Sequence, residues 1–473
     1  MRPSISLIQA RRPSRLQAAR EQLELRRREA ASASVAERAK AEKALEPLAG
    51  AVRKAEEEKS LHERRSAEKA AAAEEARRRA AGAQAAADRA LAESREAFRK
   101  LEAATAAWRA SEEEAAAARA AALGGLKPLS AASFDEAKAR HLLWRAGFGG
   151  TPEEVLRLCR QGLHASVRQL VYYTTVPAAA ASFEAWPRES PHPWLPYEAK
   201  LIEDERLHLE SARQEVERRQ VRAFRAWWLG RMAESPRPLQ EKLALFWHGH
   251  FATQYSILDQ QGFLLIRQIQ MFRQQATDYR GLLRGLVHDA AMIRYLNNDT
   301  NTRGKPNENL AREILELFSM GVGNYTEEDI RQAARALTGY TYDRSTGEFR
   351  FVRAHHDEGP KKIWFHTGPF TGDDLVDLIL QNPATARFLA RKLFIFFVHD
   401  DPSDEVVERL ASVLRESRYN VAVLLENLFA SEEFYSPRAL GSQIKSPVEL
   451  VVGTLRALGV RDGPYEALAD AVR

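Results

Sequence analysis

The sequence predicts a mainly α-helical protein: a multi-helix globular domain with one small β-hairpin, preceded by a long α-helical, coiled-coil-like hairpin. Two observations support this fold class. Residues 14–123 consist mostly of Ala, Glu, Arg, Lys and Gln, which is the composition of long exposed helices. After residue 130, apolar residues recur at spacings of three and four, the period of amphipathic helices that pack on a core.

We divide the chain into a basic arm at 1–13, expected to be disordered, a helical hairpin at 14–123, a linker at 124–130 and a helical domain at 131–473. Pro47 and Gly50 predict the turn of the hairpin, with arms near 16–45 and 52–122. Its apolar positions are mostly Ala, which favours an Ala-lined antiparallel pair or a weak coiled coil. The sparse larger anchors are Leu61, Leu91, Phe98, Leu101 and Trp108.

Composition restricts the chemistry. The single cysteine, Cys159, excludes an intrachain disulfide and a cysteine-rich metal site, so metal ligands would be His, Asp or Glu. No Gly-rich phosphate loop and no Gly-x-Ser-x-Gly motif occurs, which disfavours nucleotide kinases, dinucleotide-binding dehydrogenases and α/β-hydrolases. Five arginines occur in the first twenty residues and could contact an acidic partner. No aromatic residues are interleaved with them for base stacking, so nucleic-acid binding is the least favoured hypothesis.

No segment has the roughly 20 apolar residues of a membrane span, and none has a secretory apolar region. We therefore expect a chain without a membrane span, cytoplasmic by default. Alternation around Phe349 and Phe351, then Ile363, Trp364 and Phe365, predicts the β-hairpin. A helix that starts at Pro238 is expected to stop at Gly249. Further helices are predicted at 136–146, 152–162, 165–173, 220–233, 258–275, 279–288, 307–320, 326–338, 372–379, 383–398, 403–416, 420–430 and 445–458.

Two clusters of polar residues lie at predicted helix ends. In "FWHGHFAT", His248 and His250 would converge on one point if the helix ends at Gly249, although a continuous helix would separate them by about 200°. They are either metal ligands or histidines that satisfy the last carbonyls of a helix. "FFVHDDP", residues 396–402, is interpreted as a helix end followed by a turn.

The most extensive polar cluster is "NNDTNTRGKPNENLAREILELFSMG", residues 297–321. On a helical wheel Glu308, Arg312, Glu313 and Glu316 share one side. The polar side is either a solvated face or a functional one; the asparagine-rich loop before it needs an organising partner. The opposite side holds Leu310, Ala311, Ile314, Leu315, Leu317 and Phe318.

"HHDEGPKK", residues 355–362, lies at the turn of the predicted β-hairpin. His356 beside Asp357 is a usable metal-ligand or acid/base pair, and Gly359-Pro360 would fix the loop that carries it. Surface loops of this composition also occur without any role.

These blocks occur in the order and spacing of a bacterial family catalogued as domain of unknown function 1800, which the chain resembles over about residues 139–459. The resemblance rests on "ARHLLWRAGFGGTPEE", "FWHGHFAT", "PNENLAREILELFSMGVGNYTEEDI", "HDEGPKK" and "KSPVELVVGTLRALG". It implies a mostly helical protein without an established activity. Many members are exported, and many are encoded beside a sulfatase-like partner family. This chain has the charged hairpin in place of an export signal, and it stops where relatives typically continue through a Pro- and Trp-rich segment.

Two hypotheses follow. In the first, the clusters meet in one pocket where His248, His250, Glu308 and His356 hold a divalent Zn, Mn or Fe ion. Catalysis by Glu308, Arg312, Glu313 and Asp357 would then give a metal-dependent hydrolase or oxidase at the cell envelope. In the second, the protein is a non-enzymatic scaffold that binds a protein partner or itself through its coiled-coil arm, and the polar clusters are structural.

Overall fold

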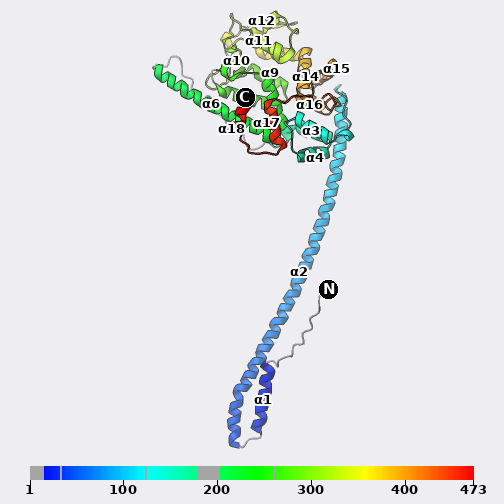
Figure 1. Cartoon of the computed structure of the whole chain (residues 1–473), viewed down its shortest axis with the longest axis vertical. Helices are drawn as coiled ribbons and strands as arrows, with labels where there is room; N and C mark the ends of the chain where they lie inside the picture. The colour runs from blue at the N-terminus through cyan, green and yellow to red at the C-terminus, as the bar shows by residue number, and fades with distance from the viewer. Residues whose placement is uncertain (1–14, 32–34, 123–124, 178–202, 259–260, 473) are drawn as a thin grey trace. The chain divides into compact units, whose positions relative to one another are not determined.

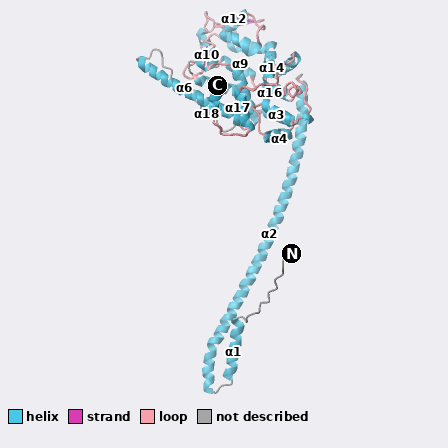
Figure 2. Cartoon of the chain, in the orientation of Figure 1, coloured by secondary structure: helices cyan, strands magenta, loops and turns pink. Residues whose placement is uncertain are grey.

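The computed structural model describes residues 15–31, 35–122, 125–177, 203–258 and 261–472. Within these ranges the chain is mostly helical, and the strands form two small antiparallel pairs, which confirms the predicted fold class (Figure 2). The chain divides into two compact units, Met1–Ala106 and Ala107–Arg473. None of the helices in the described ranges combines the length and the apolar composition that crossing a membrane requires.

The first unit contains a helical hairpin whose turn is not where Pro47 and Gly50 predict it. Helix α1 (Arg15–Ala31) is followed by α2 (Val35–Ala122), which continues through both residues (Figure 1). The prediction of a turn at 46–51 is therefore wrong. Helix α1 covers this part of α2, because Leu23 and Val52 are buried and Arg20 Nε donates to Glu56 at 3.0 Å. This packing offsets the hydrogen bond that a proline removes from a helix.

The rest of α2 has no such cover from α1. The predicted anchors Leu61, Leu91, Phe98 and Leu101 are 50 to 63% exposed, so they do not form the packed seam of an intrachain pair. The side chain of Trp108 lies outside the described part of the chain. The domain boundaries at 13, 123 and 130 stay predictions.

The second unit is built mainly from short helices, most of which end close to where the sequence predicts; the helix predicted at 220–233 is longer and starts at residue 203. In chain order, its helices begin with α3 (Glu136–Arg145), α4 (Pro152–Gln161), α5 (Leu163–Val171), α6 (Glu203–Glu234), α7 (Pro238–His250) and α8 (Gly262–Gln274). Next come α9 (Tyr279–Val287), α10 (Ala290–Tyr295), α11 (Asn309–Glu313), α12 (Glu327–Ala336), α13 (Gly372–Gln381) and α14 (Pro383–Phe397). They are followed by α15 (Asp404–Glu416), α16 (Val421–Phe429), α17 (Pro447–Ala457) and α18 (Tyr465–Ala471).

The predicted helix 307–320 has two parts. Helix α11 continues directly into the π-helix η6 (Ile314–Met320). As predicted, Leu310, Ala311 and Leu315 are fully buried, whereas Leu317 is 52% exposed. The wider hydrogen-bonded turn of a π-helix changes the angular positions of the residues that follow, which accounts for the exposure of Leu317.

The strands form two hairpins where one was predicted. Strand β1 (Tyr340–Tyr342) pairs with β2 (Phe349–Phe351), and β3 (Lys361–Ile363) pairs with β4 (His366–Gly368). Trp364 and Phe365, predicted as strand, form the turn between β3 and β4, where Trp364 has φ +53° and Phe365 is 99% exposed. Each strand therefore pairs with its nearest neighbour in sequence.

An aromatic core joins α7, α8, α9 and η6. Trp247 and Phe251 stack with ring centroids 5.5 Å apart, and Phe251 meets Phe272 and Phe318 at 5.8 and 5.4 Å. Trp247 Nε1 donates to Ala276 O at 2.8 Å, so its buried N–H is satisfied. This core fixes the end of α7, where the two histidines of the first cluster lie.

Candidate functional site

His248 and His250 point in different directions. Helix α7 does not stop at Gly249 but extends through His250, so the continuous-helix geometry applies. The His248 ring packs edge-on against Trp228 at 5.8 Å, and its Nδ1 is buried without a hydrogen-bond partner in the described residues. His250 stacks on Phe246, with ring planes 10° apart. The two imidazoles therefore do not converge.

His250 satisfies a helix-end carbonyl. Its Nε2 lies 2.9 Å from Phe318 O, and Tyr279 donates its hydroxyl to the same oxygen at 2.7 Å. Because a carbonyl only accepts, His250 carries its proton on Nε2. Burial lowers the pKa of His250 to about 4, with only partial compensation from this hydrogen bond, so the imidazole is neutral at pH 7.

The asparagine loop is organised by the end of α12. Asn298 donates Nδ2 to Leu337 O at 3.2 Å and to Tyr340 O at 3.0 Å. Asn301 donates Nδ2 to Ala334 O at 2.9 Å, and its side-chain oxygen accepts from the backbone N–H of Asn307. Both amide side chains are 1% exposed. They bind carbonyls at the end of α12 and at the start of β1, which gives two of the loop's asparagines a structural role.

Arg312 and Glu313 lie on α11, and Glu308 directly precedes it. All three are near the beginning of α12. Arg312 forms a bidentate pair with Glu327 at 2.9 and 2.8 Å and reaches Glu308 at 3.3 Å. Partial burial, and then the charge of Glu316, raises the pKa of Glu313. The Arg312 guanidinium is thus occupied by carboxylates of the protein itself.

Asp357 and His356 lie at the other end of α12. Asp357 pairs with Arg335, whose Nε donates at 2.7 Å, and this contact lowers the pKa of the carboxyl. His356 donates Nδ1–H to Thr338 O at 2.9 Å. The fully buried Lys361 donates to the carbonyls of Asp357 and Gly359. These contacts fix the loop before β3.

The predicted site residues are therefore spread over two regions: His248 and His250 lie on α7, and the others lie near the two ends of α12. Glu327 and Arg335, which hold Arg312 and Asp357, are eight positions apart, a rise of about 12 Å along the helix. Over the described ranges no group of three or more His, Cys, Asp or Glu side chains is placed to hold a metal ion. His248, His250, Glu308 and His356 do not form such a group, and metal binding is not confirmed. The catalytic roles of Glu308, Arg312, Glu313 and Asp357 stay predictions.

The segment "FFVHDDP" contains the end of α14 and the turn after it, as interpreted from the sequence. His399 is 3% exposed and its Nε2 lies 3.3 Å from Glu433 Oε1, while Asp401 pairs with Arg438. Both contacts join the turn after α14 to the segment after α16.

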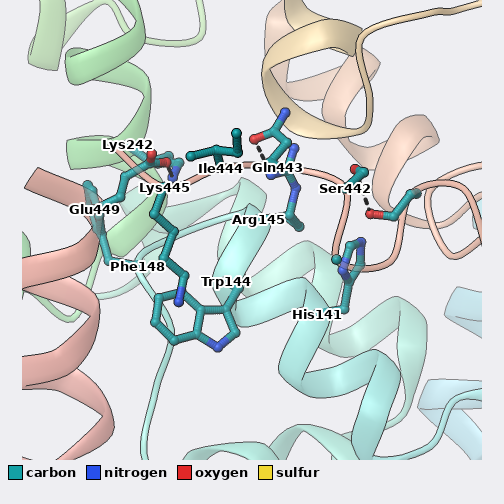
Figure 3. Close-up of a pocket in the computed structure, with 12 residues that line it drawn as sticks. His141, Trp144, Arg145, Phe148, Lys242, Ser442, Gln443, Ile444, Lys445 and Glu449 are labelled. Atoms are coloured by element: carbon teal, nitrogen blue, oxygen red, sulfur yellow. Dashed lines mark hydrogen bonds and ion pairs between the residues drawn. The ribbon is translucent and has the colours of Figure 1, made fainter. Parts of the chain in front are cut away.

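A pocket of about 200 Å³ opens between α3, α7 and the segment that leads into α17 (Figure 3). It brings together two of the family-like blocks, since one wall comes from residues 141–148 and the facing wall from 439–449. Its lining residues are His141, Trp144, Arg145, Phe148, Lys242, Ala439, Gly441, Ser442, Gln443, Ile444, Lys445 and Glu449.

A buried cation, Lys242, and a half-buried one, Arg145, face one carboxylate at this pocket. Lys242 pairs with Glu449, and their side chains are 5 and 19% exposed. Arg145 donates Nε to Phe397 O at 2.7 Å and Nη2 to Phe396 O at 2.9 Å, and it also donates to Gln443. Burial lowers the pKa of Arg145 to about 10 and also lowers the pKa of Lys242. The negative charge of Glu449 raises both pKa values and offsets part of this effect.

Trp144 forms the aromatic wall. Its ring lies against Gly149, which has φ +88°, and against Gly453 of α17, where a Cβ would overlap the ring. Lys445 Nζ lies 3.7 Å from the centroid of the Trp144 ring, and Lys242 Nζ lies 4.9 Å from that of Phe148. The cations and aromatic rings thus occupy the same small space.

Sequence reasoning did not select this pocket. The signal was present in α7, where Lys242 stands among Leu239, Leu243 and Phe246 on the apolar side of the helix. A lysine at such a position is buried only with a partner. The partner, Glu449, is more than two hundred residues away in the chain, so its proximity could not be read from the sequence.

Comparison with known proteins places the pocket inside a family match. The family described as "Protein of unknown function (DUF1800)" matches residues 141–472. The match includes both walls of the pocket and the polar clusters around α12. No curated protein and no solved structure matches the chain.

Stability against urea is expected to fall as the pH is lowered from about 6.5 to 4. His141 and His250 have pKa values of about 4 in the folded chain, whereas unfolded histidines have values of about 6.5, so only the unfolded state gains protons in this window. Above this window neither state binds the protons and the effect vanishes. His250→Phe should flatten the pH dependence, and the exposed His366→Phe should leave it unchanged; equal slopes in all three proteins would refute the assignment.

Gly453→Ala should destabilise the second unit by about 1–3 kcal/mol, because the new methyl group overlaps the Trp144 ring and approaches Phe148 O to 3.1 Å. This loss opposes the gain of up to about 1 kcal/mol that alanine brings to a helix interior. Gly249→Ala in α7 is the matched control, since no atom lies within 4 Å of its Cβ, and it should stabilise the protein. Thermal unfolding measures both, and an unchanged or raised Tm for Gly453→Ala would contradict the packing argument.

Proposed function

The chain belongs to the DUF1800 family, and we propose that this member is a non-enzymatic scaffold that associates with a second copy of itself through helix α2. The polar motifs support a structural role. His250, Asn298, Asn301 and His356 donate to backbone carbonyls at helix ends, and Arg312 is held by carboxylates of the same chain. Groups engaged in this way stabilise loops and helix ends and are not available to a substrate.

The observation that carries the proposal is an exposed apolar stripe on α2. Leu91, Phe98 and Leu101 are 52, 60 and 63% exposed. At about 100° per residue they lie within roughly 80° of one another, and their spacing matches the core positions of a heptad repeat. Exposed large apolar side chains aligned on one face of a long helix are typical of a helix that pairs with another.

The charges beside the stripe favour a second, antiparallel copy. One flank carries Asp88, Arg95 and Glu102 in alternating sign, and the other carries Ala90, Ala97 and Ala104. In an antiparallel pair, each charged flank faces the same flank of the other copy, which places Arg95 opposite Glu102 twice. In a parallel pair the charged flank would face alanines and gain nothing.

The same register also matches the apolar positions. Because the pairing is reciprocal, Phe98 of each copy packs beside Leu101 of the other, which brings four apolar side chains together. The small alanine flank lets the two helices approach closely, as in Ala-lined helix pairs. The seam is short, so we expect a dimer whose population depends on protein concentration.

Analytical ultracentrifugation should show a monomer–dimer equilibrium for the full chain. Phe98→Glu should abolish the dimer, because it places a charge in the apolar seam. Arg95→Glu should weaken dimerisation several-fold by opposing two carboxylates, and the double variant Arg95→Glu/Glu102→Arg should restore it.

Lys100→Glu is the matched control, since it reverses a charge of the same sign on the opposite side of α2. It should leave the equilibrium unchanged. A chain that stays monomeric at every concentration would overturn the proposal. A dimer that is indifferent to Arg95→Glu would overturn the antiparallel arrangement.

Elemental analysis of the purified protein separates the scaffold from the metal-dependent enzyme. We expect no stoichiometric metal, and we expect His248→Ala/His250→Ala to lower stability because Phe318 O loses a buried donor. One metal ion per chain that is lost in this variant would contradict the proposal and favour the enzyme.

A further inference from the structure

The pocket of Figure 3 carries an unbalanced charge. Arg145, Lys242 and Lys445 are cationic and Glu449 is the one carboxylate among the lining residues. His141 adds no charge at pH 7, since its Nε2 donates to Phe434 O at 3.0 Å and burial lowers its pKa to about 4. The pocket therefore has a net of two positive charges.

Lys445 is exposed, so burial penalises the one excess positive charge of Lys242 and Arg145 over Glu449. Arg145 is surrounded by neutral acceptors, the carbonyls of Phe396 and Phe397 and the Gln443 side chain. Lys242 has three N–H donors, and among the described residues its hydrogen bond goes to Glu449. A buried cation without an equal negative charge is costly, so the site favours the entry of an anion.

The walls restrict the rest of the ligand. Trp144 and Phe148 supply aromatic surface, and Ile444 at the rim is 98% exposed. The volume of about 200 Å³ is below the roughly 300–1,000 Å³ of pockets for drug-sized ligands. Cations next to aromatic faces suit a compound that has a charged group joined to a flat or apolar body.

We infer that this pocket binds a small organic anion, with its carboxylate or phosphate group beside Lys242, Arg145 and Lys445 and its apolar body against Trp144. Lys445 is exposed and supplies its charge from the solvent side, since its ammonium lies over the Trp144 ring. Glu449 holds Lys242 in place and repels dianions more strongly than monoanions. This role is independent of the association through α2.

The test is isothermal titration of the full chain with benzoate, phenyl phosphate, benzamide and inorganic phosphate. Benzoate or phenyl phosphate should bind at least about tenfold more tightly than benzamide, which lacks the charge, and than inorganic phosphate, which lacks the ring. The better of the two organic anions identifies the charged group. Equal binding of benzoate and benzamide, or no binding of either organic anion, would overturn the inference.

Lys445→Glu should weaken binding of the preferred anion about tenfold or more, because it removes the net charge of the site. The side chain is exposed, so an unchanged Tm is expected and shows that the variant folds. Lys362→Glu is the matched control: it makes the same change in net charge at an exposed position outside the pocket. Equal losses in the two variants would show a nonspecific charge effect and contradict the site.

Discussion

Helix-end carbonyls are the constraint on which this fold depends. A domain built from many short helices has many C-terminal ends, and each end leaves carbonyl groups without an intrahelical donor. Where an end is buried, water cannot supply the missing hydrogen bond and a side chain must. Phe318 O at the end of η6 receives His250 and Tyr279, the end of α14 receives Arg145, and the end of α12 receives two asparagines. Polar side chains therefore link these helix ends to neighbouring elements of the apolar core.

The same requirement separates the polar residues into two groups. The polar side chains around α12 form hydrogen bonds with carbonyls or ion pairs with opposite charges, so their polar groups are engaged within the chain. At the pocket beside α3, the need for donors to helix-end carbonyls leaves a charge that is not balanced. Arg145 satisfies the carbonyls of α14, but a guanidinium brings a full charge to a place where neutral donors would suffice. That charge joins the ammonium of Lys242, and one carboxylate is left to balance both. Arg145 thus both satisfies the carbonyls at the end of α14 and supplies positive charge to the proposed anion site.

Sequence patterns located most helices of the second unit and failed where tertiary packing decides. Pro47 predicts a break, but α1 covers this part of α2 and the helix continues. A competing signal was present, because Glu37 stands three residues after Ser34, the spacing of a capping box, and α2 starts there. At Gly249 the expected stop would have let the histidines converge; the helix runs one residue further and separates them. The pairing of Lys242 depends on a long-range contact that no local pattern encodes.

The walls of the pocket come from the two ends of the second unit. Arg145 and Gln443 are 298 residues apart in the chain, and the Arg456 guanidinium reaches Gly149 O across 307. During synthesis α3 leaves the ribosome long before its distant partners in the chain exist, and contacts of such sequence separation form late in folding. Until then α3 has only local contacts, such as those with α4, and Arg145 lacks the carbonyl acceptors of Phe396 and Phe397. The pocket is thus a feature of the completed domain alone, because its two walls are separated by most of the domain's sequence.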